Sequence, residues 1–180
     1  MKKGTILLTG FLLLALINSN AQNYQINSPD DDAEESAGYT IVTLNSQVID
    51  MTSDPTNLKN MKQIVGLRFN NIDLARGTAL SNCYLAFQVD RPSNKISMLA
   101  ISGEKSANAD AFQAVKRNLS SRVKTNAKVN WNNVEAWNET GAIMKSPDIS
   151  NVLTEIINQN EWQHGNSIVL LIDGNGMRHA

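Results

Sequence analysis

The densest set of reactive side chains in this sequence is an acidic run near its N-terminus, where five carboxylates occupy the six positions 30–35. In an extended strand, alternate residues point to opposite faces, so Asp32 and Glu34 would share one face. Asp31 and Glu35 would share the other face. Carboxylate oxygens are the ligands that Ca²⁺ prefers, and the ion takes about six to eight oxygens. The run therefore predicts a structural Ca²⁺ site built from these four side chains or, alternatively, a solvated acidic edge that discourages strand pairing between chains.

Two tryptophans form the second set of candidate residues. Trp137 and Trp162 lie in polar, turn-like surroundings, "EAWNET" and "NEWQHG". An exposed indole ring stacks on the C–H face of a sugar, while nearby amides and carboxylates bond to its hydroxyls. These residues therefore predict a ligand-binding site for a glycan. The alternative is that each ring closes one end of the fold and donates its N–H to a loop carbonyl.

The remaining reactive residue types do not form a catalytic pattern. Cys83 lies on the inward face of a predicted strand, where a small buried side chain is expected. His164 and His179 have no partner at the spacing of a zinc motif or a Cys–His dyad. The chain is therefore predicted not to be an enzyme. A hydrolase remains a distant alternative, because paired carboxylates have no fixed spacing in a sequence.

The first residues of the chain are typical of a signal peptide. Lys2 and Lys3 precede the apolar stretch "ILLTGFLLLALI", which is too short and poorly flanked to span a membrane. Small residues at 19–21 then provide a cleavage site before Gln22. We expect residues 1–21 to be removed, and the chain to be secreted or held at the cell surface without a membrane span.

Composition excludes further classes of protein. A formal net charge of −1 disfavours the basic surface that binds nucleic acid. One cysteine excludes an internal disulfide. Residues 22–180 are long enough to form one domain with its own core.

Alternating hydrophobicity predicts a mainly β fold. Runs with a period of two residues occur at 39–44, 64–69, 83–89, 96–101 and 127–131. The run "SIVLLI" at 167–172 is apolar on both faces, as a central strand would be. Turn-forming clusters such as "SDPTN" and "RPSN" separate the runs. These features predict a jelly-roll-like antiparallel β-sandwich.

A single helix is predicted at about 147–159. Its apolar residues follow the spacing of one helical face: Ile149, Val152, Leu153, Ile156 and Ile157. Ser146 is expected to cap the helix, with Pro147 at its first position and Asp148 complementing the dipole.

The C-terminal residues suggest that the sandwich is incomplete. "DGNG" at 173–176 is a hairpin signal that should begin another strand, yet only residues 177–180 follow it. We expect the natural chain to continue into a strand that closes the sheet, or the open edge to associate with another chain.

The order of these features resembles a known family. The stretches "VGLRFNNIDLARGTALSNCYLAFQVD", "ISGEKSANADAF", "LSSRVKTNAKVNW" and "PDISNVLTEIINQNEWQHGNSIVLLIDGNG" are similar to a recurrent domain of secreted and surface proteins of bacteria. That domain is similar in plan to DNRLRE-type carbohydrate-binding modules. The resemblance implies a jelly-roll-like sandwich with a non-catalytic role in a larger extracellular protein. Glu104, Arg122 and Arg178 match recurrent polar positions of the family, which implies ion pairs that pin strand ends.

The sequence thus predicts an exported binding module that recognises an extracellular glycan or another surface component. A structural spacer or adhesion domain without a small ligand is the alternative.

Overall fold

The computed structural model describes residues 21–26, 28–36, 42–44, 46–52 and 62–180. Within these residues the chain forms ten strands and one helix, arranged as a mainly antiparallel β-sandwich. The predicted fold class is therefore confirmed. Most of the predicted signal peptide lies outside the described residues. No helix in the described part of the chain has the length and apolarity needed to cross a bilayer.

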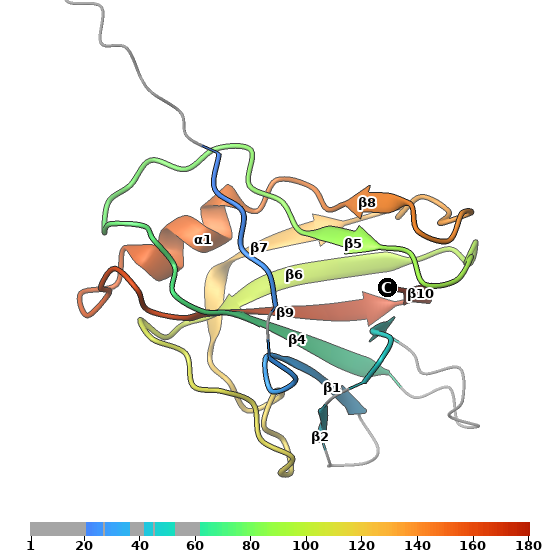
Figure 1. Ribbon diagram of the computed structural model, residues 1–180, viewed down its shortest axis with the longest axis horizontal. Coiled ribbons are helices and arrows are strands. Elements are labelled where there is room, and N and C mark those ends of the chain that lie inside the picture. The colour runs from blue at the N-terminus through green and yellow to red at the C-terminus, as the bar shows by residue number, and fades with distance from the viewer. Residues whose placement is uncertain (1–20, 27, 37–41, 45, 53–61) are drawn as a thin grey trace, which may run out of the picture.

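The first layer is a six-stranded sheet in the order β2-β1-β4-β9-β6-β7 (Figure 1). Its strands are β1 (Asp32–Ser36), β2 (Val42–Leu44), β4 (Gln63–Phe69), β6 (Met98–Glu104), β7 (Lys124–Trp131) and β9 (Ile168–Asn175). All neighbouring strands are antiparallel. Strand β9 lies between β4 and β6, and its first five residues are buried. This confirms the prediction that "SIVLLI" forms a central strand.

The second layer consists of two strand pairs and the helix. These elements are β3 (Asp50–Met51), β5 (Ala86–Gln88), β8 (Ile143–Lys145), β10 (Arg178–His179) and α1 (Ser150–Ile157). Val65 and Leu67 of β4 enter the same core as Phe87 of β5 and Ile156 of α1. The ring of Phe87 stacks at 6.3 Å from that of Trp131, measured between centroids. The larger core thus lies between the sheet and this second layer.

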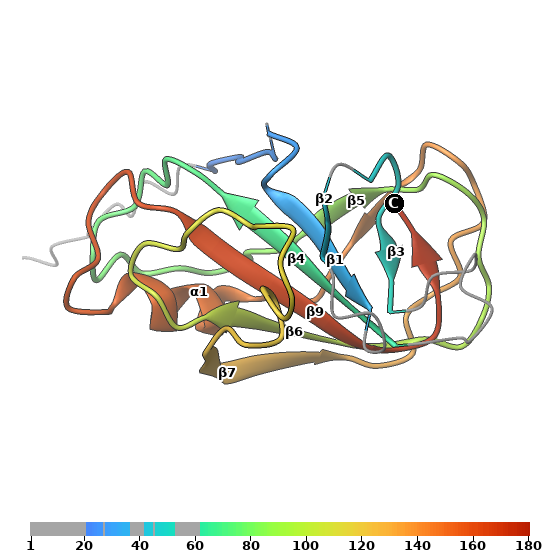
Figure 2. The ribbon, with the colours of Figure 1, turned by 90° about the horizontal axis from the view of Figure 1, so that it is seen from below.

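The opposite face of the sheet is covered by the irregular segment 105–123, which joins β6 to β7. Figure 2 shows this segment, in yellow, passing over β9 and β4. Its residues Phe112 and Leu119 are buried against Val169 and Leu171 of β9. The approach is so close that a Cβ atom on Gly66 would lie 2.7 Å from Cζ of Phe112. The centre of the sheet is therefore covered on both faces.

The helix begins later than the sequence predicted. Ile149, not Ser146, is the N-cap residue, and it makes no side-chain capping bond. The Ser146 hydroxyl instead accepts a hydrogen bond of 2.9 Å from the Leu85 N–H, beside β5. The predicted apolar stripe is confirmed. Four of its residues are buried and Leu153 is partly buried: the four are Ile149, Val152, Ile156 and Ile157.

After β9 the chain turns into β10, which pairs with β3 and not with β9. The Ala180 N–H donates to the Ile49 carbonyl at 3.1 Å, and the Ile49 N–H donates back at 2.7 Å. Gly174, near the end of β9, has a φ of +146°, and a Cβ there would lie 2.1 Å from the Met98 carbonyl oxygen. A strand does follow "DGNG", but the predicted hairpin is wrong, since residues 173–175 belong to β9 and β10 pairs with β3. Whether the natural chain continues stays a prediction.

Replacing Gly66 by alanine should destabilise the protein by about 1–3 kcal/mol, because the new methyl group overpacks the contact with Phe112. Chemical denaturation measures the loss. Adding Phe112→Leu should restore part of the stability, since the smaller side chain makes room. Losses that simply add in the double variant would contradict the close approach.

Candidate functional site

The acidic run begins just before β1 and continues along it. Its residues alternate as predicted, with Asp31 and Glu35 buried and Asp32 and Glu34 on the other face. The Glu35 carboxylate accepts hydrogen bonds of 2.8 Å and 3.0 Å from the backbone N–H groups of Leu119 and Ser120. Glu35 therefore holds one end of the covering segment 105–123.

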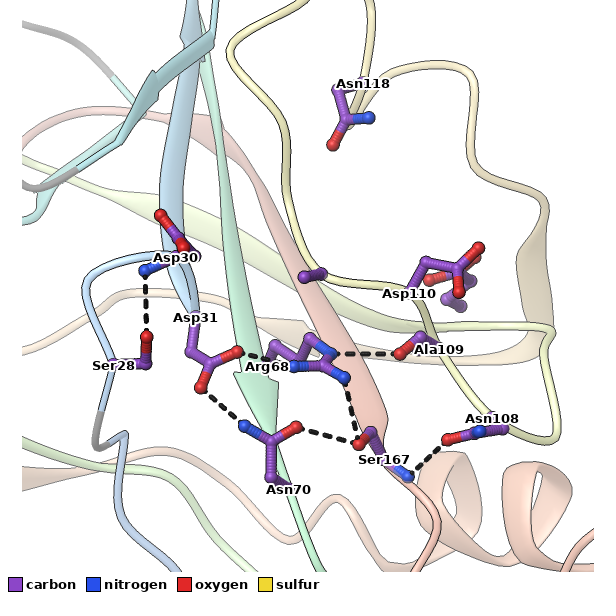
Figure 3. Close-up of polar contacts among 12 residues, drawn as sticks. Ser28, Asp30, Asp31, Arg68, Asn70, Asn108, Ala109, Asp110, Asn118 and Ser167 are labelled. Atoms are coloured by element: carbon purple, nitrogen blue, oxygen red, sulfur yellow. Dashed lines mark hydrogen bonds and ion pairs between the residues drawn. The ribbon is translucent and has the colours of Figure 1, made fainter.

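Asp31 forms a buried ion pair with Arg68 of β4. Arg68 Nη1 lies 2.7 Å from Asp31 Oδ1, and these side chains are only 17% and 3% exposed. The guanidinium also donates to the Ala109 carbonyl at 2.9 Å and to the Ser167 hydroxyl at 3.2 Å (Figure 3). One arginine of β4 thus connects the residues just before β1 and β9 with the covering segment.

Amide side chains complete this network. Asn70 Nδ2 donates to Asp31 Oδ2 at 2.5 Å, and the Ser167 hydroxyl donates to Asn70 Oδ1 at 2.8 Å. The Ser167 N–H donates to Asn108 Oδ1 at 2.9 Å (Figure 3). Because each of these polar groups has a protein partner, the network is suited to holding segments together.

Arg122, near the same end of the covering segment as the Glu35 contacts, ties that end to Glu104 of β6 and to earlier residues of the segment. Its Nη1 lies 2.5 Å from Oε2 of Glu104, and its guanidinium carbon lies 4.7 Å from the centre of the Phe112 ring. It also donates to the carbonyls of Asp110 and Asn118. The structure therefore contains the Glu104–Arg122 ion pair that the family resemblance implied.

Arg178 does not form the ion pair that the resemblance implied. Its side chain is buried, and its donors bond to the Ser97 hydroxyl and to backbone carbonyls. These carbonyls belong to Lys95, Val134, Glu135 and Met177. Burial lowers the pKa of Arg178, against an opposing effect of the Glu135 charge. Carbonyl dipoles replace a counter-ion here, so Arg178 fastens the C-terminal residues to two loops.

The predicted calcium ligands do not converge. Asp31 and Glu35 are bound as described above, and Glu34 accepts the Asp50 N–H at 2.5 Å. Asp32 is half-buried, and this burial is the main cause that raises the pKa of its carboxyl group. In the described ranges, no group of three or more His, Cys, Asp or Glu residues is placed to hold a metal ion. A guanidinium, an amide and backbone N–H groups bind oxygens of Asp31, Glu34 and Glu35. Calcium binding by the run stays a prediction.

The two candidate tryptophans are buried. Trp137 is 0% exposed and Trp162 is 5% exposed, so neither ring presents the open face that stacking on a sugar requires. Trp162 Nε1 donates to the Leu74 carbonyl at 2.9 Å, and the Trp137 ring lies 5.9 Å from that of Phe87. The prediction of exposed stacking rings was wrong, since both rings are buried in the core. Trp162 donates its N–H to a loop carbonyl, as the alternative expected, whereas the buried Nε1 of Trp137 has no hydrogen-bond partner within the described residues.

The exposed aromatic ring lies elsewhere, beside β5. Tyr84 is 48% exposed, and among the described aromatic side chains it alone is classed as exposed. Lys145 Nζ lies 4.2 Å above the centre of its ring and 3.0 Å from its hydroxyl. Sequence alternation already placed Tyr84 and Gln88 outward. It missed β8, because three residues are too few to show a period of two.

The outer face of the β5–β8 pair is exposed along its length. Ala86 pairs with Lys145, and Gln88 pairs with Ile143. All four side chains point away from the core, as Tyr84 does. We call these five residues the Tyr84 face.

A second polar surface lies between the covering segment and the end of α1. It is an open cleft of about 600 Å³ lined by Lys105, Ser106, Ala107, Asn158, Gln159, Asn160 and Glu161. The side-chain oxygens of Asn158 and Asn160 accept bonds from the Gly77 N–H and from Arg76. The last lining residue, Glu161, directly precedes Trp162 in the sequence, but the Trp162 ring does not line the cleft.

Comparison with known proteins gives no assignment. No protein-family model matches the sequence, and no curated protein matches it. The resemblance to carbohydrate-binding modules therefore stays a prediction.

Replacing Arg68 by methionine should lower the free energy of unfolding by about 3–5 kcal/mol, because the Asp31 carboxylate would remain buried without a cation. The matched control is Lys124→Met. Lys124 pairs with Asp173 at 2.6 Å, but these side chains are 35% and 34% exposed. This second loss should not exceed about 1 kcal/mol. Denaturant titration measures both, and equal losses would contradict the structural role of the buried pair.

Calcium binding by the acidic run can be tested by melting. A ligand that binds only the native state at a hundredfold excess over Kd adds about 2.7 kcal/mol of stability. Since protein donors already bind these carboxylates, we expect the same thermal midpoint in calcium and in chelator. A midpoint that rises with calcium and falls when Asp32 is replaced by asparagine would show that the run binds the ion.

Proposed function

We propose that this chain is an exported, non-catalytic module that binds an extracellular glycan through the Tyr84 face. The observation that carries the proposal is the 48% exposed ring of Tyr84 on an otherwise accessible strand pair. An aromatic ring offers a flat apolar surface to the C–H face of a sugar. Export is supported by the predicted signal peptide.

The neighbours of Tyr84 suit a polyhydroxylated ligand. Residues 84, 86 and 88 share one face, with alternate positions about 6.6 Å apart along a strand. Ala86, the small residue between Tyr84 and Gln88, leaves room for a sugar ring above the strand. Lys145 would donate hydrogen bonds to its hydroxyls, Gln88 would both donate and accept, and Ile143 would add apolar contact.

A structural spacer or adhesion domain is the second candidate. This candidate is favoured because several charged and aromatic side chains that the sequence predicted to bind a ligand instead bind other parts of the fold. Asp31, Glu35 and Trp162 all stabilise contacts within the fold. A domain of this kind needs a rigid body more than it needs a ligand.

The proposal predicts that Tyr84→Ala weakens glycan binding by about tenfold, equivalent to about 1.4 kcal/mol. Tyr84→Phe keeps the ring and should retain most of the affinity. The control is Lys128→Ala. Lys128 is exposed on β7, in the other sheet, so this variant should bind the glycan as the parent does. A glycan array on the exported protein identifies the ligand, and titration of each variant measures the affinity.

Both Tyr84 variants should keep the stability of the parent to within about 0.5 kcal/mol, since the side chain lies on the surface. A change in affinity could then not be attributed to unfolding. An array that shows no binding to cell-wall or plant glycans would contradict the glycan proposal and favour the structural spacer. Binding that Tyr84→Ala leaves intact would move the site away from this face.

A further inference from the structure

Residues 21–26 lie against the body of the sandwich, with Tyr24 and Ile26 partly buried against the larger core. The Tyr24 hydroxyl donates a hydrogen bond of 2.6 Å to the side-chain oxygen Oε1 of Gln22. The same hydroxyl oxygen accepts the Asp73 N–H at 3.0 Å. A fixed chain of hydrogen bonds therefore runs from Asp73 through Tyr24 to the amide of Gln22.

We propose that Gln22, once cleavage after Ala21 makes it the N-terminal residue, closes to pyroglutamate with assistance from the Tyr24 hydroxyl. The inference rests on the export proposed above, since cleavage supplies the free amine. It assigns a modification to Gln22 and a positioning role to Tyr24.

The reaction needs no partner beyond the chain itself. The lone pair of the Gln22 α-amine attacks Cδ of its own side chain, and a new N–Cδ bond closes a five-membered lactam. The Cδ–Nε2 bond breaks, and Nε2 leaves as ammonia with the proton that the amine gives up. No oxidant, reductant or second substrate takes part, so atoms and charge balance.

Tyr24 is placed to assist the attack. When the amine adds to Cδ, negative charge develops on Oε1, the atom that already accepts the Tyr24 hydrogen bond. A donor aimed at a developing oxyanion lowers the barrier to its formation. The Asp73 N–H polarises the phenol and strengthens it as a donor.

The titration of Tyr24 is consistent with this role. Burial raises the pKa of its hydroxyl, with the Asp73 charge acting in the same direction and the Asp73 N–H opposing it. The hydroxyl therefore remains a donor at the mildly alkaline pH at which a terminal amine loses its proton.

Cyclisation would change the N-terminus chemically. It removes the cationic amine and leaves a neutral ring that aminopeptidases do not recognise. Tyr24 and Ile26, two and four residues after Gln22, pack on the core. The ring would therefore protect from aminopeptidases a segment that contributes to the fold.

The experiment uses the full chain with a protease cleavage sequence inserted between Ala21 and Gln22, so that cleavage releases Gln22 at a defined time. Mass spectrometry of the N-terminal peptide should show the loss of one ammonia. Tyr24→Phe should slow this loss by about threefold to tenfold, the effect of one partly exposed hydrogen bond. Gln22→Glu, which lacks an ammonia leaving group, is the control for the mass assignment.

A denatured sample separates the effect of the folded structure on the cyclisation rate from the effect of the local sequence. In denaturant the Tyr24 contact is absent, so the parent and Tyr24→Phe should cyclise at the same rate. Equal rates in the native state would overturn the role of Tyr24. A Gln22 that stays uncyclised would overturn the modification itself. In parallel, a chain that stays inside the cell with residues 1–21 attached would contradict export, and this result is independent of the rates measured after protease cleavage.

Discussion

The central strand β9 is apolar on both faces, so the fold must cover its sheet twice. On one face regular elements provide the cover, through α1 and the strand pairs of the second layer. On the other face the cover is segment 105–123, which has no ladder of its own to satisfy its backbone. Backbone groups of an irregular segment held over a buried surface need hydrogen-bond partners, and charged side chains provide several of them here. The arrangement of charges in this protein follows from that requirement.

Three charged side chains meet the requirement from different elements. Glu35 of β1 accepts N–H groups of the segment, Arg68 of β4 donates to one of its carbonyls, and Arg122 donates to others. Each charge is partly or fully buried, so each needs a partner of its own. Asp31 provides that partner for Arg68, and Glu104 provides it for Arg122. Asp31 and Glu35 of the acidic run thus form part of an internal framework.

Sequence periodicity predicted the features that depend on neighbouring residues. The central strand, the inward face of β4 and the apolar stripe of α1 are all visible within short windows. The candidate site depends on contacts that windows do not contain. Lys145 and Tyr84 are 61 residues apart, and Arg68 is 37 residues from Asp31. Trp162 was misjudged for the same reason: its neighbours in the sequence are polar, while the neighbour that decides its orientation is the distant Leu74 carbonyl.

In the β5–β8 pair, the residues that hold the strands to the core are separate from the face that we propose to bind a ligand. A two-stranded sheet is marginally stable alone, so it must be held by its inner face. Leu85, Phe87 and Val89 provide that hold, and they alternate with Tyr84 and Gln88 on the outside. Because the two sets point in opposite directions, the outer residues can change without a cost to the core. Selection for a ligand would therefore act on this face more freely than on the acidic run, whose side chains are already bound within the fold.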